Sequence, residues 1–287
     1  MEFYKTRKHQ TMITDNLTNT VFLSNWLQEE CPTLYQSLTK ALEDHAVDYR
    51  ILGKTNDIWC RDYMPIQIEK NRFVSYKYNP DYLQAKHKRR FITDANNVEN
   101  IDFIRKAEII KLDLVVDGGN VVKCGDSIVM TDKVFVENKD KTPDDVVRKL
   151  RDAFQCDILF LPWDRAEWCG HSDGIVHYAG DGKILLTNYK DFSSSYYYKF
   201  RKVLKDRFEI IPLNYKVKRH SKRSWCYINF LQVGKLVLVP QIGMEEDSPA
   251  LEQIGKALPD CDVIGIPALE AVRKGGALNC ISWNIKN

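Results

Sequence analysis

The sequence predicts an α/β fold of five related units, arranged as a pseudo-symmetric α/β propeller that forms one closed domain over residues 1–287. Two observations lead to this prediction. Pairs of alternating apolar and polar runs recur along the chain, and the polar stretch before each pair recurs at a constant interval. With Asp62, Asp117, His171, Cys226 and Cys280 as markers, the intervals are 55, 54, 55 and 54 residues. Units that recur in this way bury their apolar faces against neighbouring units, and a closed ring of them has no free edge.

The alternating runs are predicted to form β-hairpins, because apolar residues alternate with polar ones on either side of a turn. The four runs are "PIQIEKNRFVSYKY" from Pro65, "VVKCGDSIVMTDKVF" from Val121, "IVHYAGDGKILLTNY" from Ile175 and "INFLQVGKLVLVPQI" from Ile228. Evenly spaced hairpins also occur in an ordinary α/β sandwich, which is the alternative architecture.

A compact apolar run precedes most of the polar stretches and is predicted to form a further strand. These runs are "EIIKL" at Glu108, "DILFLP" at Asp157, "EIIPLN" at Glu209 and "DVIGIP" at Asp262. Ahead of them lie segments whose apolar residues are three and four apart, as in helices. The clearest begins at Thr142, a candidate N-cap that is followed by Pro143 and two acidic residues, and others begin at Ser248 and near Ser193. Each unit is expected to run helix, strand, polar stretch and hairpin.

The fifth unit lacks part of its hairpin, because the sequence ends at Asn287 shortly after the strand-like "CISWNI". A closed ring requires another segment to complete this unit, and the residues from Thr11 to Leu23 are the free candidate. Cys280 is then expected on the strand that closes the ring, held by neighbours on both sides.

The composition is that of an ordinary globular protein, with 44% hydrophobic and 28% charged residues. No apolar stretch approaches the roughly 20 residues that a membrane span needs, and the first residues do not resemble a secretory signal. We therefore expect a cytoplasmic protein without a membrane partner. A net charge of +3 gives little reason to expect a nucleic-acid partner, so the basic clusters at Lys86–Arg90 and Lys216–Arg223 are interpreted as solvated loops. The oligomeric state is left open, with a homo-oligomer among the alternatives.

The eight cysteines show neither the pattern of a disulfide framework nor the spacing of a zinc site. Most are expected to be small buried groups, including Cys60, Cys169 and Cys226, and one is expected to react. In a ring, the polar stretches of all units converge near the axis, so a cysteine, a histidine and several carboxylates become neighbours. This set suits covalent catalysis on a cationic group, because sulfur attacks, imidazole moves protons and carboxylates hold the cation.

Five motifs occur in order along the chain: "NDIWCRDYMP", "DGGN", "GHSD", "SWCYINFLQVGKLVLVPQIG" and "KGGALNCISWN". Together they resemble motifs of the guanidino-group-modifying enzymes, specifically the agmatine deiminases and bacterial peptidylarginine deiminases. "NDIWCRDYMP" is similar to that family's Asn-Asp-x-Trp-x-Arg-Asp-x-Gly-Pro stretch, "DGGN" to its acidic Gly-Gly-Asn stretch and "GHSD" to its Gly-His-x-Asp. "SWCYINFLQVGKLVLVPQIG" resembles its Tyr-Ile-Asn segment, and "KGGALNCISWN" resembles the Gly-Gly loop that carries the nucleophile. The resemblance runs from about Asn56 to Trp283 and implies the five-unit, pentein-like α/β propeller, in agreement with the period.

The resemblance implies a guanidine deiminase that converts a small arginine-derived substrate, agmatine or a relative, to a ureido product and ammonia, with no cofactor. By resemblance, the catalytic residues are Cys280 as nucleophile, His171 for proton transfer, and Asp62 and Asp173 to hold the guanidinium. Candidate substrate-binding residues are Asp117, Trp59 and Asn120. For three of these residues another interpretation is open: Asp62 can pair with Arg61, Asp117 can cap a turn or orient His171, and Trp59 can pack in the core.

Two positions depart from the family pattern. Met64 stands where the family usually has glycine, which can reshape the pocket, and Gly174 stands where agmatine deiminases usually have glutamate, which weakens the case for agmatine itself. Three alternatives therefore accompany the leading interpretation: a peptidylarginine deiminase, an amidinotransferase in which an amine resolves the intermediate, and a non-catalytic propeller that binds protein or nucleic acid.

Overall fold

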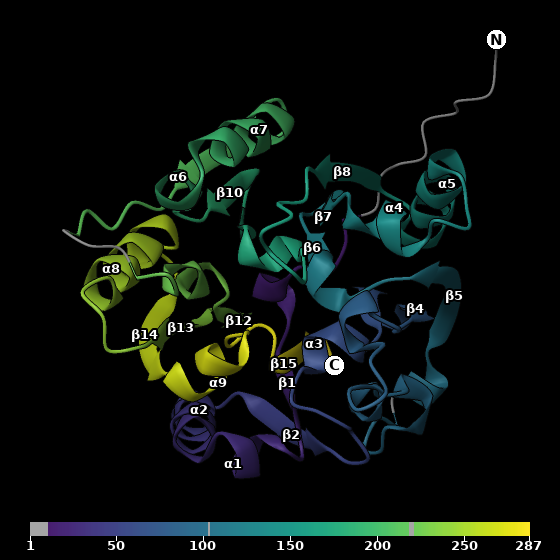
Figure 1. Cartoon of the computed structure of the whole chain (residues 1–287). Coiled ribbons are helices and arrows are strands. Elements are labelled where there is room, and N and C mark those ends of the chain that lie inside the picture. Colours follow the sequence, from purple (N-terminus) through teal and green to yellow (C-terminus); the bar gives the residue numbers. More distant parts are fainter. Residues whose placement is uncertain (1–10, 103, 218–220) are drawn as a thin grey trace.

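The computed structural model describes residues 11–102, 104–217 and 221–287. In this part of the chain, five three-stranded sheets lie around a common centre, with the longer helices on the outside (Figure 1). The predicted α/β class with five similar units is confirmed at this level. The basic residues 218–220 of the second predicted cluster lie outside the described residues.

Each sheet has the same construction: two antiparallel strands, with a third strand parallel to the middle one. All four predicted hairpins and all four predicted further strands are present. The sheets are β3 (Ile66–Glu69), β4 (Arg72–Lys77) and β5 (Glu108–Val115); β6 (Val122–Lys123), β7 (Ser127–Thr131) and β8 (Asp157–Leu161); β9 (Val176–Gly180), β10 (Lys183–Leu186) and β11 (Glu209–Pro212); β12 (Leu231–Val233), β13 (Leu236–Gln241) and β14 (Asp262–Pro267); and β1 (Thr20–Ser24), β2 (Asp48–Leu52) and β15 (Ser282–Ile285).

The two ends of the described chain meet in one sheet. The N-terminal strand β1 pairs antiparallel with the C-terminal strand β15, with Phe22 opposite Trp283, and parallel with β2. This confirms that the segment near the start of the sequence completes the fifth unit. Cys280 lies two residues before β15, in a buried loop.

The helices connect the sheets. They are α1 (Leu27–Glu30), α2 (Pro32–Asp44), α3 (Cys60–Tyr63), α4 (Lys133–Glu137), α5 (Pro143–Phe154), α6 (Tyr189–Phe192), α7 (Ser194–Leu204), α8 (Asp247–Ala257) and α9 (Leu269–Lys274). The N-cap prediction for α5 is confirmed, because the backbone N–H of Asp145 donates to Thr142 Oγ1. The helix predicted from Ser248 begins one residue earlier, at Asp247.

One unit departs from the predicted order. The connection between β4 and β5 contains short 3₁₀ turns (Asp81–Leu83, Arg89–Phe91, Ala95–Asn97 and Ile104–Lys106) where the other connections carry α-helices. The prediction of a helix in every unit is therefore wrong here. The basic run at Lys86–Arg90 and the Pro80 before the first turn do not support an amphipathic helix. Residues 78–91 of this connection are named the covering segment, because several of them line the central cavity described below.

Apolar side chains fill the space between the sheets and the outer helices. The largest cluster joins β1, β13 and the buried faces of α2 and α8, with residues such as Leu23, Leu38, Leu238 and Ile254 fully buried. No helix among the described residues has the length and apolar character needed to cross a bilayer. Polar loops meet at the centre, and loops held by a packed scaffold often contain functional residues.

Candidate active site

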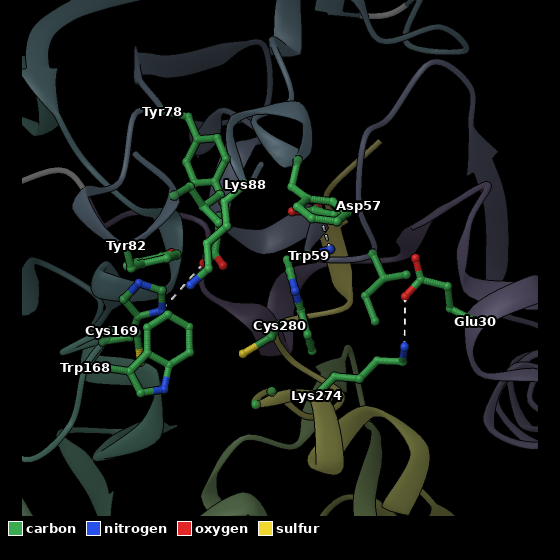
Figure 2. A pocket seen from close by; sticks show the side chains of 17 residues that line it. Glu30, Asp57, Trp59, Tyr78, Tyr82, Lys88, Trp168, Cys169, Lys274 and Cys280 are labelled. Atoms are coloured by element: carbon green, nitrogen blue, oxygen red, sulfur yellow. Dashed lines mark hydrogen bonds and ion pairs between the residues drawn. The ribbon is translucent and has the colours of Figure 1, made fainter. Parts of the chain in front are cut away.

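A cavity of about 310 Å³ opens near the centre, where the polar loops of several units meet (Figure 2). Its walls come from five parts of the chain: Glu30 at the end of α1, the loop and helix around Trp59 and Asp62, the covering segment, the loop from Trp168 to His171, and the loop from Lys274 to Cys280. Cys280, His171 and Asp62 therefore share one cavity although more than 200 residues separate the first from the last in the sequence.

Two glycines of the "DGGN" stretch, Gly118 and Gly119, lie where other parts of the chain approach the backbone closely. A Cβ at Gly119 would lie 2.6 Å from His171 Nδ1 and 2.7 Å from Asp62 Oδ1, and a Cβ at Gly118 would lie 1.9 Å from the carbonyl oxygen of Arg61. The two glycines thus allow α3 and the histidine loop to approach the backbone directly. In this packing the N–H of Gly119 donates to Asp62 Oδ1 at 3.0 Å, which fixes that carboxylate.

His171 lies between two carboxylates. Its Nε2 is 3.0 Å from Asp117 Oδ2, and its Nδ1 is 3.6 Å from Asp62 Oδ1. Burial alone would lower the pKa of His171, but the two aspartates outweigh it and raise that pKa well above its ordinary value. Burial, together with the nearby Asp117 and Asp173, raises the pKa of Asp62 to about 7 in spite of His171. These contacts favour the imidazolium form of His171, and Asp117 binds its Nε2.

Cys280 is buried in an acidic environment. Its Sγ lies 3.2 Å from Asn229 Oδ1 and 3.6 Å from Asp173 Oδ2. Burial and the charges of Asp173 and Asp62 raise the pKa of the thiol well above its ordinary value. This environment favours the neutral thiol, and a cation beside the sulfur would stabilise the thiolate.

Asp173 lies behind the sulfur rather than on the cavity wall. Its Oδ2 accepts a hydrogen bond from Asn279 Nδ2 at 2.7 Å, and its backbone carbonyl accepts one from Asn229 Nδ2 at 3.4 Å. Asn229 Oδ1 in turn accepts from the N–H groups of Ala277 and Cys280. These two asparagines hold the loop that contains Cys280 against the loop that contains His171 and Asp173. The sequence interpretation did not assign them roles, although Asn229 stands in the quoted "YIN" segment.

The remaining sequence candidates are placed as follows. Trp59 lines the cavity and packs so closely on the Gly-Gly loop that a Cβ at Gly276 would lie 2.3 Å from its ring. Asn120 is buried, and both polar atoms of its side-chain amide are hydrogen-bonded to the backbone of Thr131. Arg61 does not pair with Asp62: its Nη2 donates to Asn284 Oδ1 at 2.6 Å, and its backbone N–H donates to the carbonyl of Cys280.

The two departures from the family pattern have different surroundings. Met64 is buried in an apolar cluster with Tyr63 and Phe73, so its side chain fills core volume. A Cβ at Gly174 would meet no atom within 4 Å, so a larger residue fits there and its absence is not steric. Among the described residues, no group of three or more histidine, cysteine, aspartate or glutamate side chains is arranged to hold a metal ion.

The outer part of the cavity carries charges that the sequence interpretation missed. Lys88, from the cluster interpreted as a solvated loop, points into the cavity from the covering segment (Figure 2). On the opposite side, Lys274 Nζ pairs with Glu30 at 3.1 Å. Asp57 also lines this part, and burial with the nearby Asp62 raises its pKa to about 8. The aromatic rim includes Tyr82 and Trp168, whose ring centroids lie 4.6 Å apart.

A family model matches residues 18–285, and its description is the Porphyromonas-type peptidyl-arginine deiminases. The chain belongs to this family. Within the curated proteins, this peptidyl-arginine deiminase family member is 26% identical over 207 residues to a Lactococcus lactis protein assigned as an agmatine deiminase, which covers 59% of this chain and 57% of that protein. It is 23% identical over 278 residues to a Vibrio parahaemolyticus protein with the same assignment, which covers 80% of this chain and 76% of that protein. The chain thus spans little more than half the length of the Lactococcus relative.

Solved structures resemble this family member in fold. The agmatine deiminase of C. jejuni superimposes with a TM-score of 0.77 at 19% identity, over 96% of both chains. An amidinotransferase from Microseira wollei superimposes with a TM-score of 0.60 at 14% identity, over 97% of both chains. At such identities the likeness concerns the fold, and the same fold therefore occurs with two different reactions on guanidino groups.

Proposed function

We propose that this chain is a guanidine deiminase, a hydrolase of linear amidines that acts on a small arginine-derived guanidine and works as one catalytic domain, a pseudo-symmetric five-unit propeller. The observation that supports this most strongly is the shared cavity of Cys280, His171 and Asp62, with Asp173 behind the sulfur. A guanidinium is planar and positive, and its N–H groups match carboxylates in its plane. Asp62, on the cavity wall, would hold such an ion with its central carbon facing Cys280, and the charge of Asp173 beside the sulfur would attract it.

The first half of the reaction starts from the neutral thiol. When the substrate cation binds beside the sulfur, it offsets the charges of Asp62 and Asp173 and lowers the pKa of Cys280, so the thiol proton is lost to solvent. The thiolate attacks the guanidinium carbon and forms a C–S bond. His171, held as an imidazolium, gives its proton to the departing nitrogen, which leaves as ammonia. The product of this half is a thiouronium, with the substrate's carbon bound to Cys280.

The second half hydrolyses this intermediate. Neutral His171 takes a proton from a water molecule, the resulting hydroxide attacks the same carbon, and the C–S bond breaks. The carbon leaves as a ureido group, and the sulfur recovers its proton. Asp117 keeps one imidazole orientation through both halves, because its carboxylate is bound to Nε2 while Nδ1 faces the cavity.

The substrate's tail would lie in the outer part of the cavity. An ammonium tail, as in agmatine, calls for a free carboxylate there, but Glu30 is paired with Lys274, and the pKa of about 8 keeps Asp57 largely neutral at pH 7. Lys88 points into the same space, and no carboxylate of the described residues lies within ion-pair distance of it. These charges favour a tail that carries a carboxylate, as in arginine or a C-terminal arginine residue.

Incubation with agmatine, arginine and short peptides with internal or C-terminal arginine tests this proposal. Ammonia and ureido product are expected from at least one of them, with water as the acceptor and no added metal or cofactor. Cys280→Ala is expected to abolish turnover with every substrate, and its far-UV circular dichroism should match that of the parent. Ureido product from Cys280→Ala at the parent's rate would refute the assigned nucleophile.

Amidinotransfer is the second candidate, because the Microseira wollei enzyme shares this fold. In that reaction the alkylamine leaves and a second amine resolves the amidino-cysteine. Ammonia release in water without any amine acceptor supports hydrolysis, whereas product formation that depends on an added amine supports transfer. Failure of every guanidine to react or to bind would favour the non-catalytic alternative.

A further inference from the structure

Lys133 is a buried lysine close to the proposed active site, although its side chain does not line the cavity. It is the first residue of α4, directly after β7, and its side chain is 1% exposed. Burying an ammonium costs several kcal/mol unless it is well paired. Its Nζ lies 2.6 Å from Glu137 Oε1, 3.1 Å from Asp81 Oδ1 and 3.8 Å from Asp117 Oδ2. Three carboxylates thus surround the buried ammonium and offset the cost of burying it.

The three carboxylates come from three segments of the chain, because Asp117 belongs to the loop after β5. Asp81 belongs to the covering segment, and so does Tyr82, whose ring lies 5.1 Å from the ammonium. Glu137 belongs to α4 itself. Cations over aromatic faces add a favourable interaction that grows when water is excluded. Lys133 therefore fastens the covering segment to the sheet of β6, β7 and β8.

The opposite side of the ammonium faces the histidine. Asp117 Oδ2 lies between Lys133 Nζ, at 3.8 Å, and His171 Nε2, at 3.0 Å. The other oxygen of Asp117 is buried and has no hydrogen-bond partner among the described residues. The lysine stem also packs under Gly170, where a Cβ would lie 2.8 Å from Lys133 Cδ and where φ is +62°. A side chain at position 170, directly before His171, would therefore clash with Lys133.

We propose that Lys133 is a positioning residue that couples the covering segment to the Asp117–His171 pair. Its buried charge holds the covering segment over the cavity and also fixes the orientation of the proton-transferring imidazole. The proposal deepens the proposed function, on which its kinetic consequences rest. Its structural consequences can be measured without any turnover.

The charge of Lys133 also has a predictable effect on His171. The titratable and charged groups around His171 are Asp62 from α3, Asp117 from the loop after β5, Tyr82 from the covering segment and Cys169 from its own loop, with Lys133 and Glu137 of α4 nearby. A positive charge so close opposes protonation of the imidazole, so its removal raises the pKa of His171. Removing Lys133 alone would leave Glu137 beside Asp117, and the pKa of Glu137 is already raised to about 7 by burial and by Asp117. The double variant Lys133→Met, Glu137→Gln removes the ammonium without leaving that acid unpaired.

The first experiment follows the imidazole of His171 by NMR in protein with labelled histidine, in the single variant Glu137→Gln and in this double variant, so that the two proteins differ only in the ammonium of Lys133. We expect the titration midpoint of His171 to rise by about half a pH unit or more, in line with a charge removed at short range. If the double variant folds and the midpoint is unchanged, Lys133 does not act on His171 and the proposal is overturned. Because the readout is a titration, it holds whether or not the protein is a deiminase.

The second experiment tests the link to the covering segment and uses Asp81→Asn. Asp81 is about half exposed, so this variant is expected to fold even if the double variant does not. The basic run at Lys86–Arg90 offers exposed trypsin sites in the same segment. Cleavage there is expected to be severalfold faster in Asp81→Asn than in the parent. Asp102→Asn, at an exposed surface ion pair with Arg105, is the control and should match the parent.

Kinetics complete the test once a substrate is known. Asp81→Asn should raise KM severalfold and change kcat less than twofold, because the covering segment is held less firmly while Asp117 and His171 keep their charges. The double variant should lower kcat as well and shift the pH profile upward with the NMR midpoint. Cleavage at residues 86–90 that is equally fast in Asp81→Asn, Asp102→Asn and the parent would show that Lys133 does not hold the covering segment, and would overturn the coupling.

Discussion

Cys280 Sγ lies 3.6 Å from Asp173 Oδ2, so the proposed nucleophile is in contact with a carboxylate that opposes its ionisation. A substrate cation bound beside the sulfur would offset this charge. The site is thus arranged to form its thiolate in the presence of a guanidinium and to keep a neutral thiol otherwise. This arrangement protects the sulfur from electrophiles when no substrate is bound.

Asp173→Asn should therefore have opposite effects on two reactions of Cys280. Removal of the charge lowers the pKa of the thiol, so alkylation of Cys280 by iodoacetamide at pH 8 should be faster, by about tenfold for one pKa unit. Turnover of the guanidine should fall on the order of 10²-fold, because the cation loses a buried partner. Peptide mass spectrometry measures alkylation at Cys280 separately from the other cysteines. Asp206→Asn, at an exposed position, is the control, and slower alkylation of Cys280 in Asp173→Asn would contradict this account.

Asn229 should contribute to both stability and reactivity. Its Oδ1 accepts from the buried N–H groups of Ala277 and Cys280, so Asn229→Ala leaves two donors unpaired and should lower the free energy of unfolding by about 2–4 kcal/mol. Asn229→Asp keeps the acceptor but adds a negative charge near the thiol, which raises the pKa of Cys280 and slows its alkylation. Chemical denaturation and the alkylation assay measure the two effects. Equal alkylation rates in Asn229→Asp and the parent would show that this charge does not reach the sulfur.

Asp57 should reduce stability at alkaline pH. Its pKa is raised from 3.8 to about 8 in the folded protein by burial, so the folded state binds more protons than the unfolded state between these two values. The parent should therefore lose stability as pH rises from 5 to 8.5. Asp57→Asn keeps an oxygen for the N–H of Trp59 and should lose about 2 kcal/mol less over this interval. Denaturation of both proteins at pH 5 and pH 8.5 measures the difference, and parallel losses would contradict the assigned shift.

Lys88 should select the substrate's tail. Lys88→Met removes the cation that points into the outer cavity and should raise KM for a carboxylate-bearing guanidine by about tenfold, or 1.4 kcal/mol, while KM for agmatine stays the same or falls. Lys86→Met, in the same basic run, is the matched control. Equal increases for both substrates would indicate a packing role for the lysine stem, and no change for either would remove Lys88 from substrate recognition.

Much of this architecture could be predicted from the sequence, because hairpin signals and polar loops recur at nearly constant spacing. Thr142 marked the start of α5 by local chemistry alone, and the pairing of β1 with β15 followed from the need to complete the fifth unit. The missing helix between β4 and β5 could not be predicted from the period. There the basic run and the short turns replaced the repeating pattern.

The sequence interpretation of the site identified Cys280, His171 and Asp62, which the structure brings to one cavity. It missed contacts that arise from tertiary packing, because their residues have no motif of their own. Lys88 was interpreted as a solvated loop residue; it is exposed in a loop, as expected, and it also lines the cavity. Lys133 was not noticed, since a lysine four residues before a glutamate usually marks an exposed helical pair.

The most direct test of the central claim is acid quenching of the enzyme during turnover, followed by mass analysis of the peptide that contains Cys280. We predict a covalent adduct on Cys280 with the mass of the substrate minus ammonia, which disappears as ureido product forms and is absent from Cys280→Ala. Turnover without any adduct on Cys280, together with undiminished product formation by Cys280→Ala, would contradict the account.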